Sequence, residues 1–222
     1  NRSIIMRRRR YKRYNANNSD RIKLYIVGGI ALVVLVIILA VALASGRNKD
    51  SSGKNDGDKD TKLGTNAVLQ VNQLIERYYE AKKDCDATAL MSLIYPSMVI
   101  DESELKTEAE FVEDYRNVIC YTLPGLSEDS YVVWVEFEYK FHGIDKTAPA
   151  LNRLYVMKST ETDEYQIYAT PDDEMMAYVE KLSEREDVKE LSVRIEERLQ
   201  KALEADKQLM DFYGQLTAKS IR

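Results

Sequence analysis

The stretch SYVVWVEFEYKF, residues 130–141, carries the clearest structural pattern in the sequence. Its large apolar side chains recur at every second position, which is the period of a β-strand. They are Tyr131, Val133, Val135, Phe137, Tyr139 and Phe141. Glu136, Glu138 and Lys140 lie between them, so the other face carries charge. We therefore predict a long antiparallel strand with one buried face and one half-exposed face.

Further strands are expected on both sides of this one. Turn residues at Pro124 and Gly125, and again from Thr160 to Asp163, separate apolar stretches of strand length. These stretches lie at residues 117–123, 151–158 and 164–169. With 130–141 they predict a meander of four consecutive antiparallel strands. A separate short strand is predicted over residues 98–100.

Three helices are predicted before this meander. Residues 67–83 place apolar side chains at three- and four-residue spacing. Asp86 is an N-cap candidate for a short helix over residues 87–94. Thr107 and Glu110 match a capping box, which predicts a third helix running through Tyr115. Three helices packed against one antiparallel sheet define an α+β fold class.

The chain is predicted to be helical again after Pro171. Apolar residues between Met175 and Leu182 form a first stripe, and Ser183 with Glu186 favours a restart. A longer amphipathic helix is expected over residues 187–217. Arg198 falls on a position that a coiled coil needs to be apolar, so packing against the domain is favoured over self-association.

The segment from Leu24 to Ala44 contains no charged side chain. As a helix its 21 residues would be about 31 Å long, close to the hydrocarbon thickness of a bilayer. We therefore predict a single transmembrane helix, with the lipid bilayer as a partner through Leu24 to Ala44. A signal peptide cleaved after Ala44 is the alternative, but the apolar run is longer than a signal core usually is.

Charge is distributed unequally about this segment. Residues 1–23 carry nine Lys or Arg against one Asp, whereas residues 63–222 have a net charge of −14. Basic residues beside a membrane helix keep that end cytoplasmic. We therefore expect a single-pass protein of the cell membrane, with the N-terminus cytoplasmic and the acidic C-terminal domain extracytoplasmic. An acidic domain also argues against a nucleic-acid partner.

Residues 45–66 are polar apart from Leu63, so they are expected to form a flexible linker. The predicted organisation has five parts: a basic cytoplasmic tail (1–23), the transmembrane helix (24–44), the linker (45–66), one folded domain (67–170) and a C-terminal helical extension (171–222).

The predicted order of elements resembles the nuclear transport factor 2-like superfamily, whose cone-shaped fold packs three helices on a curved antiparallel sheet. Two stretches carry the resemblance. They are RYYEAKKDCDATALMSLI, residues 77–94, and VICYTLPGLSEDSYVVWVEFEYKFHGID, residues 118–145. The whole plan is also similar to that of membrane-anchored extracytoplasmic proteins of Gram-positive bacteria. Scaffold subunits of conjugation and type IV secretion machines share the same architecture, which implies assembly with other proteins.

Enzymes of this superfamily carry an acid or base inside the cone, and Tyr79, Asp101, Tyr121, Tyr139 and His142 are the matching candidates here. For each we favour a structural role. Tyr79 and Tyr139 are expected in the core, Asp101 in a capping loop and His142 in an exposed loop. Trp134 interrupts the charged face of its strand, so it packs under the C-terminal helix or belongs to an exposed partner patch.

Four of these residues form our candidate pocket or partner surface: Tyr79, Tyr121, Trp134 and Tyr139. We assign no catalytic, cofactor-binding or metal-binding residue, because the sequence has one His, no Gly-rich phosphate loop and no cluster of metal ligands. Cys85 and Cys120 are expected to be buried free thiols, with a disulfide as the alternative.

The sequence favours a non-catalytic scaffold or protein-interaction module of the cell envelope. Its partner would be an envelope protein, or a second copy of the chain through the C-terminal helix. A small-ligand-binding or sensory domain that uses the interior of the cone is the alternative. An isomerase- or dehydratase-like enzyme is the third choice.

Overall fold

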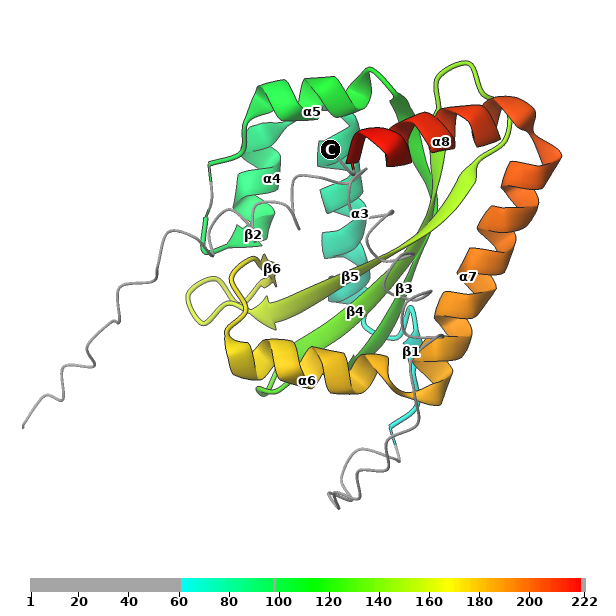
Figure 1. The fold of residues 1–222 in the computed structure, drawn as a ribbon. Coiled ribbons are helices and arrows are strands. Elements are labelled where there is room, and N and C mark those ends of the chain that lie inside the picture. Colours follow the sequence, from blue (N-terminus) through cyan, green and yellow to red (C-terminus); the bar gives the residue numbers. More distant parts are fainter. Residues whose placement is uncertain (1–60, 98, 221–222) are drawn as a thin grey trace, which may run out of the picture.

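The computed structural model describes residues 61–97 and 99–220, with side chains described as far as Leu216 (Figure 1). In that part of the chain six helices pack around one sheet. They are α3 (Leu69–Lys83), α4 (Ala87–Leu93), α5 (Glu102–Ala109), α6 (Asp173–Ser183), α7 (Glu186–Ala205) and α8 (Lys207–Ser220). The predicted basic tail, the transmembrane helix over 24–44 and most of the linker lie outside the described residues.

The sheet has six strands in the order β1-β3-β4-β5-β6-β2. Their bounds are β1 (Gly64–Thr65), β2 (Ile94–Tyr95), β3 (Val112–Pro124), β4 (Ser130–Phe141), β5 (Ala148–Lys158) and β6 (Tyr165–Tyr168). Strands β3 to β6 form the predicted antiparallel meander. β1 adds an antiparallel edge beside β3, whereas β2 runs parallel to β6 at the other edge.

The predicted fold class is therefore wrong. A purely antiparallel four-stranded sheet under three helices, followed by a helical extension, was expected behind a transmembrane helix. The described residues instead form a mixed α/β fold with six helices and a six-stranded sheet that includes a parallel pair. Strands of two residues, such as β1 and β2, are too short to show a period in the sequence. No described helix is long and apolar enough to cross a membrane, and residues 24–44 lie outside this part.

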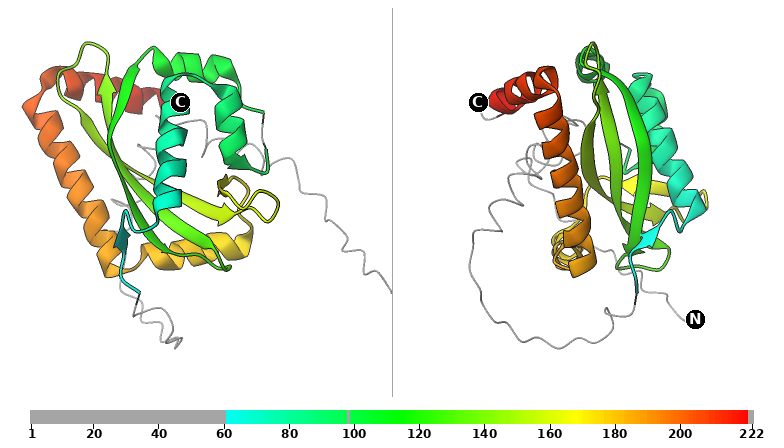
Figure 2. Two further views of the ribbon diagram at one scale, coloured as in Figure 1. Left: turned by 180° about the vertical axis from the view of Figure 1, so that it is seen from behind. Right: turned by 90° about the vertical axis from the view of Figure 1, so that its right-hand side faces the viewer.

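Strand β4 is buried on both faces, which corrects the prediction of a half-exposed face. Val133, Val135, Phe137 and Tyr139 join the large cluster under α3, as expected. Val132 and Trp134 point the opposite way, into a second cluster with residues of α6 and α7. The result is three layers, with α3 on one side of the sheet and α7 on the other (Figure 2).

The first two helices confirm the sequence prediction. The apolar stripe of α3 is buried, including Val71, Leu74 and Ile75. Asp86 caps α4 by accepting a hydrogen bond from the Ala89 N–H at 2.8 Å. Good agreement is expected here because caps and helical periods are local signals.

The next segment departs from the prediction. Helix α5 begins after Asp101, which accepts a hydrogen bond from the Ser103 N–H at 2.8 Å, and it ends at Ala109. The residues from Val112 to Tyr115 therefore extend β3 by pairing with β4, and the predicted helix through Tyr115 is absent. The short strand lies at Ile94–Tyr95, before the predicted residues 98–100.

The C-terminal helices pack against the domain, as predicted, but the helix expected over 187–217 is broken. The side chain of Asp206 accepts hydrogen bonds from Gln208 N–H at 2.9 Å and Leu209 N–H at 3.1 Å, so a new helix, α8, begins at Lys207. Leu209 is fully buried in the large cluster. α8 thus returns across the end of the sheet (Figure 1).

The second buried face predicts a clear mutational effect. Val132→Ala is expected to lower the free energy of unfolding by about 2 kcal/mol, because a fully buried branched side chain is removed. Chemical denaturation measures this difference. Val193→Ala, on the exposed side of α7, is the control and is expected to change stability by about 0.5 kcal/mol or less. An equally small effect of Val132→Ala would contradict the burial of this face.

Candidate functional site

The structure divides the four candidate residues between opposite faces of the sheet. Tyr79 and Tyr139 belong to the cluster between α3 and the sheet. Trp134 belongs to the cluster under α6 and α7, and Tyr121 packs against the same cluster. The four side chains therefore do not line one site.

Aromatic rings fill the space between α3 and the sheet. The ring centroids of Tyr79 and Phe137 lie 4.7 Å apart, and those of Tyr79 and Tyr115 lie 5.2 Å apart. Tyr139 contacts Phe137 at 4.9 Å and stacks on Phe141 at 5.5 Å. These distances are those of packed aromatic pairs. The region in which the superfamily resemblance places a ligand is thus occupied by the protein's own side chains.

A buried ion pair adjoins these rings. Lys82 Nζ of α3 lies 2.9 Å from Glu108 Oε1 of α5, and both side chains are less than a tenth exposed. The hydroxyl of Tyr115 donates a hydrogen bond to the same carboxylate oxygen at 2.6 Å. Lys82 Nζ also lies 5.2 Å from the centroid of the Tyr115 ring, which places it in range of a cation–π interaction. Together these contacts join α3, α5 and β3.

Burial and charge shift the pKa values of these groups. Burial lowers the pKa of Lys82, but the Glu108 carboxylate outweighs burial and raises it above the usual lysine value. Burial, reinforced by the Glu108 charge, raises the pKa of Tyr115 far above that of an ordinary tyrosine. Lys82 is thus held as a cation and Tyr115 as a neutral donor. Neither is tuned toward neutral pH, as a general acid or base would be.

The sequence prediction missed this group of residues. Lys82 and Glu108 are 26 positions apart, and charged residues are rarely buried. Glu108 was also assigned to a helix of the wrong span. The available local signal was Asp101, whose capping position shifts the helix and turns Glu108 toward α3.

The other acid–base candidates have structural contacts. Asp101 is the N-cap of α5, as predicted. His142 is exposed beyond the end of β4, also as predicted, and its Nε2 lies 3.2 Å from the carbonyl oxygen of Ala109. Within residues 61–97 and 99–220, neither side chain forms a hydrogen bond or ion pair with Lys82 or Glu108.

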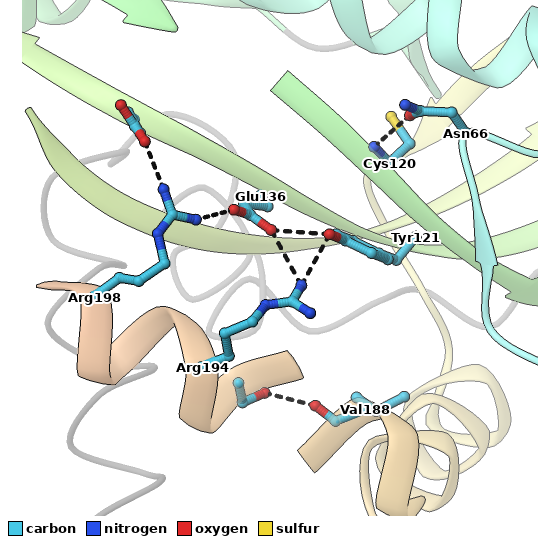
Figure 3. A network of polar contacts seen from close by, with 9 residues as sticks. Asn66, Cys120, Tyr121, Glu136, Val188, Arg194 and Arg198 are labelled. Carbon is cyan, nitrogen blue, oxygen red and sulfur yellow. Dashed lines mark hydrogen bonds and ion pairs between the residues drawn. The ribbon is translucent and has the colours of Figure 1, made fainter. Parts of the chain in front are cut away.

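A second polar network joins β4 to α7 (Figure 3). Glu136 is buried, and its Oε2 accepts a hydrogen bond from the Tyr121 hydroxyl at 3.0 Å. Arg194 donates to the same hydroxyl at 2.9 Å and lies 3.4 Å from Glu136 Oε2. Arg198 pairs with Glu136 Oε1 and, at 2.6 Å, with Glu138 Oε1. Arg198, the residue that interrupts the predicted heptad, therefore pairs with both glutamates of β4.

Trp134 lies next to this network and is only 3% exposed. It shares its cluster with Leu182 of α6 and with Val188, Leu191 and Ile195 of α7. Of the two alternatives for Trp134, packing under the C-terminal helix is confirmed. An exposed partner patch centred on Trp134 is excluded in this conformation.

Cys85 and Cys120 are both free thiols, as expected, but only Cys120 is buried, since Cys85 is partly exposed. Burial raises the pKa of the Cys120 thiol to about 12, which makes it unreactive as a nucleophile. Among the described residues, no group of three or more His, Cys, Asp or Glu side chains is placed to hold a metal ion.

Comparison of the chain with protein-family models, with curated proteins and with solved structures finds no match. The resemblances suggested by the sequence therefore stay predictions.

The buried ion pair predicts an asymmetric response to mutation. Lys82→Met should destabilise the protein by about 3–5 kcal/mol, because it leaves the Glu108 carboxylate buried without a cation. The triple variant Lys82→Met, Glu108→Leu and Tyr115→Phe removes all three polar groups and should recover most of the lost free energy of unfolding. Thermal and urea unfolding measure both effects.

The matched control is the exposed pair of Lys106 and Glu102, also on α5. Lys106→Met should cost ~0.5 kcal/mol or less, because exposed ion pairs contribute little. If Lys82→Met lowered the free energy of unfolding as little as Lys106→Met, the prediction would be contradicted. The Glu108 carboxylate would then have to be hydrated in the folded protein.

Proposed function

We propose that this chain is a non-catalytic protein-interaction module of the cell envelope, which a membrane segment displays outside the cell. The single observation that carries the first part is the filled interior. Aromatic rings occupy the region between α3 and β4, and Lys82 and Glu108 beside them are held in a buried ion pair. A fold whose faces are both covered offers its outer surface for recognition.

The outer surface carries apolar side chains suited to such contacts. Tyr95, on the edge strand β2, is 55% exposed and stacks on Tyr168 of β6 with centroids 5.8 Å apart. Val193 of α7 and Met210 of α8 are about half exposed on other sides. Partner proteins commonly engage exposed aromatic and aliphatic side chains of this kind. The partner is an envelope protein or a second copy of the chain.

The proposed location rests on the sequence before residue 61. The apolar segment from Leu24 to Ala44 and the basic residues before it support a cytoplasmic N-terminus. The acidic domain then lies outside the membrane.

Protease added to intact, wall-stripped cells should therefore degrade the folded domain and spare an N-terminal fragment.

Photo-crosslinking in cells tests the interaction proposal. A photoreactive amino acid is placed in the full chain at Tyr95, Val193 or Met210, one position at a time. We expect at least one position to give a single adduct of defined mass, and Leu74, buried inside the domain, to give none. Formation of no adduct from any surface position would contradict an interaction module.

The alternative function, a small-ligand or sensory site in the interior, is favoured by one observation. The hydroxyl of Tyr79 is buried and makes no hydrogen bond of normal geometry, although Asn152 is near enough to lower its pKa against the dominant effect of burial. Such a group would be satisfied by a bound polar ligand. An isomerase- or dehydratase-like enzyme ranks third, because the pKa values of Lys82 and Tyr115 are both raised, away from the neutral pH at which proton transfer would be efficient.

Tyr79→Phe distinguishes the first two functions. In an interaction module, removal of an unsatisfied buried hydroxyl should raise the free energy of unfolding by about 1 kcal/mol. Differential scanning calorimetry of the full chain measures the change. Tyr115→Phe, which removes a hydroxyl that is hydrogen-bonded to Glu108, is the control and should destabilise. Destabilisation by Tyr79→Phe only when cell extract is present would instead support a bound ligand.

A further inference from the structure

The residues that enter the domain, 61–66, are fastened at several points; we call them the entry strap. Gly64 and Thr65 pair with Thr122 and Tyr121 at the edge of β3. Asn66 exchanges two hydrogen bonds with Cys120, since its N–H donates to the Cys120 carbonyl at 2.7 Å and its side-chain oxygen accepts from the Cys120 N–H at 2.9 Å. The end of the predicted linker is thus part of the sheet.

The same strap is also fastened to the junction between α6 and α7. Arg185 Nη2 donates a hydrogen bond to the carbonyl oxygen of Thr61 at 2.7 Å. The guanidinium is held by Asp187, with contacts of 3.0 Å and 2.8 Å to its two carboxylate oxygens. Asp187 also accepts a hydrogen bond from the Leu63 N–H. Arg185 and Asp187 are the residues at which α7 starts, so the strap holds the beginning of this helix.

Helix α7 covers an apolar cluster that is distinct from the main core. The cluster is built from Leu123, Val132, Trp134 and Tyr155 of the sheet, Leu182 of α6, and Val188, Leu191 and Ile195 of α7. Leu63 of the strap packs against it. Farther along α7, Leu199 joins the main core instead. The first half of α7 therefore covers the second cluster, while its second half is anchored on the main core.

We propose that the entry strap is a latch, and that its release lets α6 and the first half of α7 open from the sheet and expose the Trp134 face. The α3 side of the domain stays folded during this opening, because its cluster is separate. The latch consists entirely of described residues, 61–66 with Arg185 and Asp187. The inference is thus independent of the proposed function.

The opened face has a definite chemistry. Val132, Trp134 and Tyr155 would form an apolar stripe, and departure of Arg194 would free Glu136 Oε2 at one end, while Arg198 of the anchored half still pairs with Oε1. This arrangement complements an amphipathic helix that carries one arginine beside its apolar side, as the first half of α7 itself does with Arg194. The face exposed by release therefore fits a helix of that kind.

Two variants release the latch by different means. Arg185→Ala removes the clamp on Thr61. Gly64→Ala places a Cβ 2.8 Å from the Ala67 Cβ and 3.2 Å from the Thr122 Oγ1, so β1 must shift. Arg116→Ala is the matched control, because Arg116 also pairs with an aspartate two residues away, Asp114, but on a different part of the sheet.

Trp134 is the single tryptophan of the chain, so its fluorescence reports directly on the cover. In the full chain, both latch variants should raise acrylamide quenching of Trp134 about twofold by favouring local opening. Hydrogen exchange should accelerate in residues 61–66 and in the first half of α7, while α3 keeps its protection. Arg116→Ala should change none of these.

Three outcomes would overturn the proposal. Unchanged quenching in a variant whose strap amides exchange faster would mean that the strap does not hold the cover. Unchanged strap exchange in Arg185→Ala would mean that Arg185 does not hold the strap. Loss of protection in α3 together with α7 would mean that the cover opens only when the whole domain unfolds.

Discussion

The burial of β4 on both faces sets the layers of this fold. A strand that is apolar on one side needs one covering layer, but Val132 and Trp134 on the second side demand another. α3 supplies the first cover, and α6 with α7 supplies the second. The second cover brings a difficulty, because it also buries Glu136. Arg194, Arg198 and Tyr121 meet the hydrogen-bonding and charge requirements of this carboxylate, which is why α7 can lie across a charged part of the sheet.

Local signals in the sequence predicted the centre of the fold well. Strand β4 has the predicted bounds, Ser130–Phe141, and Asp86 starts α4, because alternation and capping are properties of neighbouring residues. The failures have a common physical cause. Glu136 and Glu138 of β4 looked like solvent-facing positions because their arginine partner lies about 60 residues away, on α7. Pairing at that distance in sequence leaves no periodic trace.

The candidate site shows the same division. Tyr79 and Tyr139 were predicted as core residues from their apolar stripes, and both are buried. Lys82 and Glu108, which form the most unusual polar contact beneath α3, could not be paired from sequence, since each looks like an ordinary surface residue of an amphipathic helix. Both polar groups, this pair and the Glu136 network, join elements that are distant in the chain. They favour one arrangement of the helices over others, while apolar burial supplies most of the stability.

Native-state hydrogen exchange, resolved along the chain, tests the double cover of β4 most directly. If both faces are covered, the amides of Ser130–Phe141 exchange only through global unfolding, and all of them belong to the slowest class in the protein. Exchange in β4 as fast as in the edge strands Gly64–Thr65 and Ile94–Tyr95 would contradict the burial of both faces of this strand.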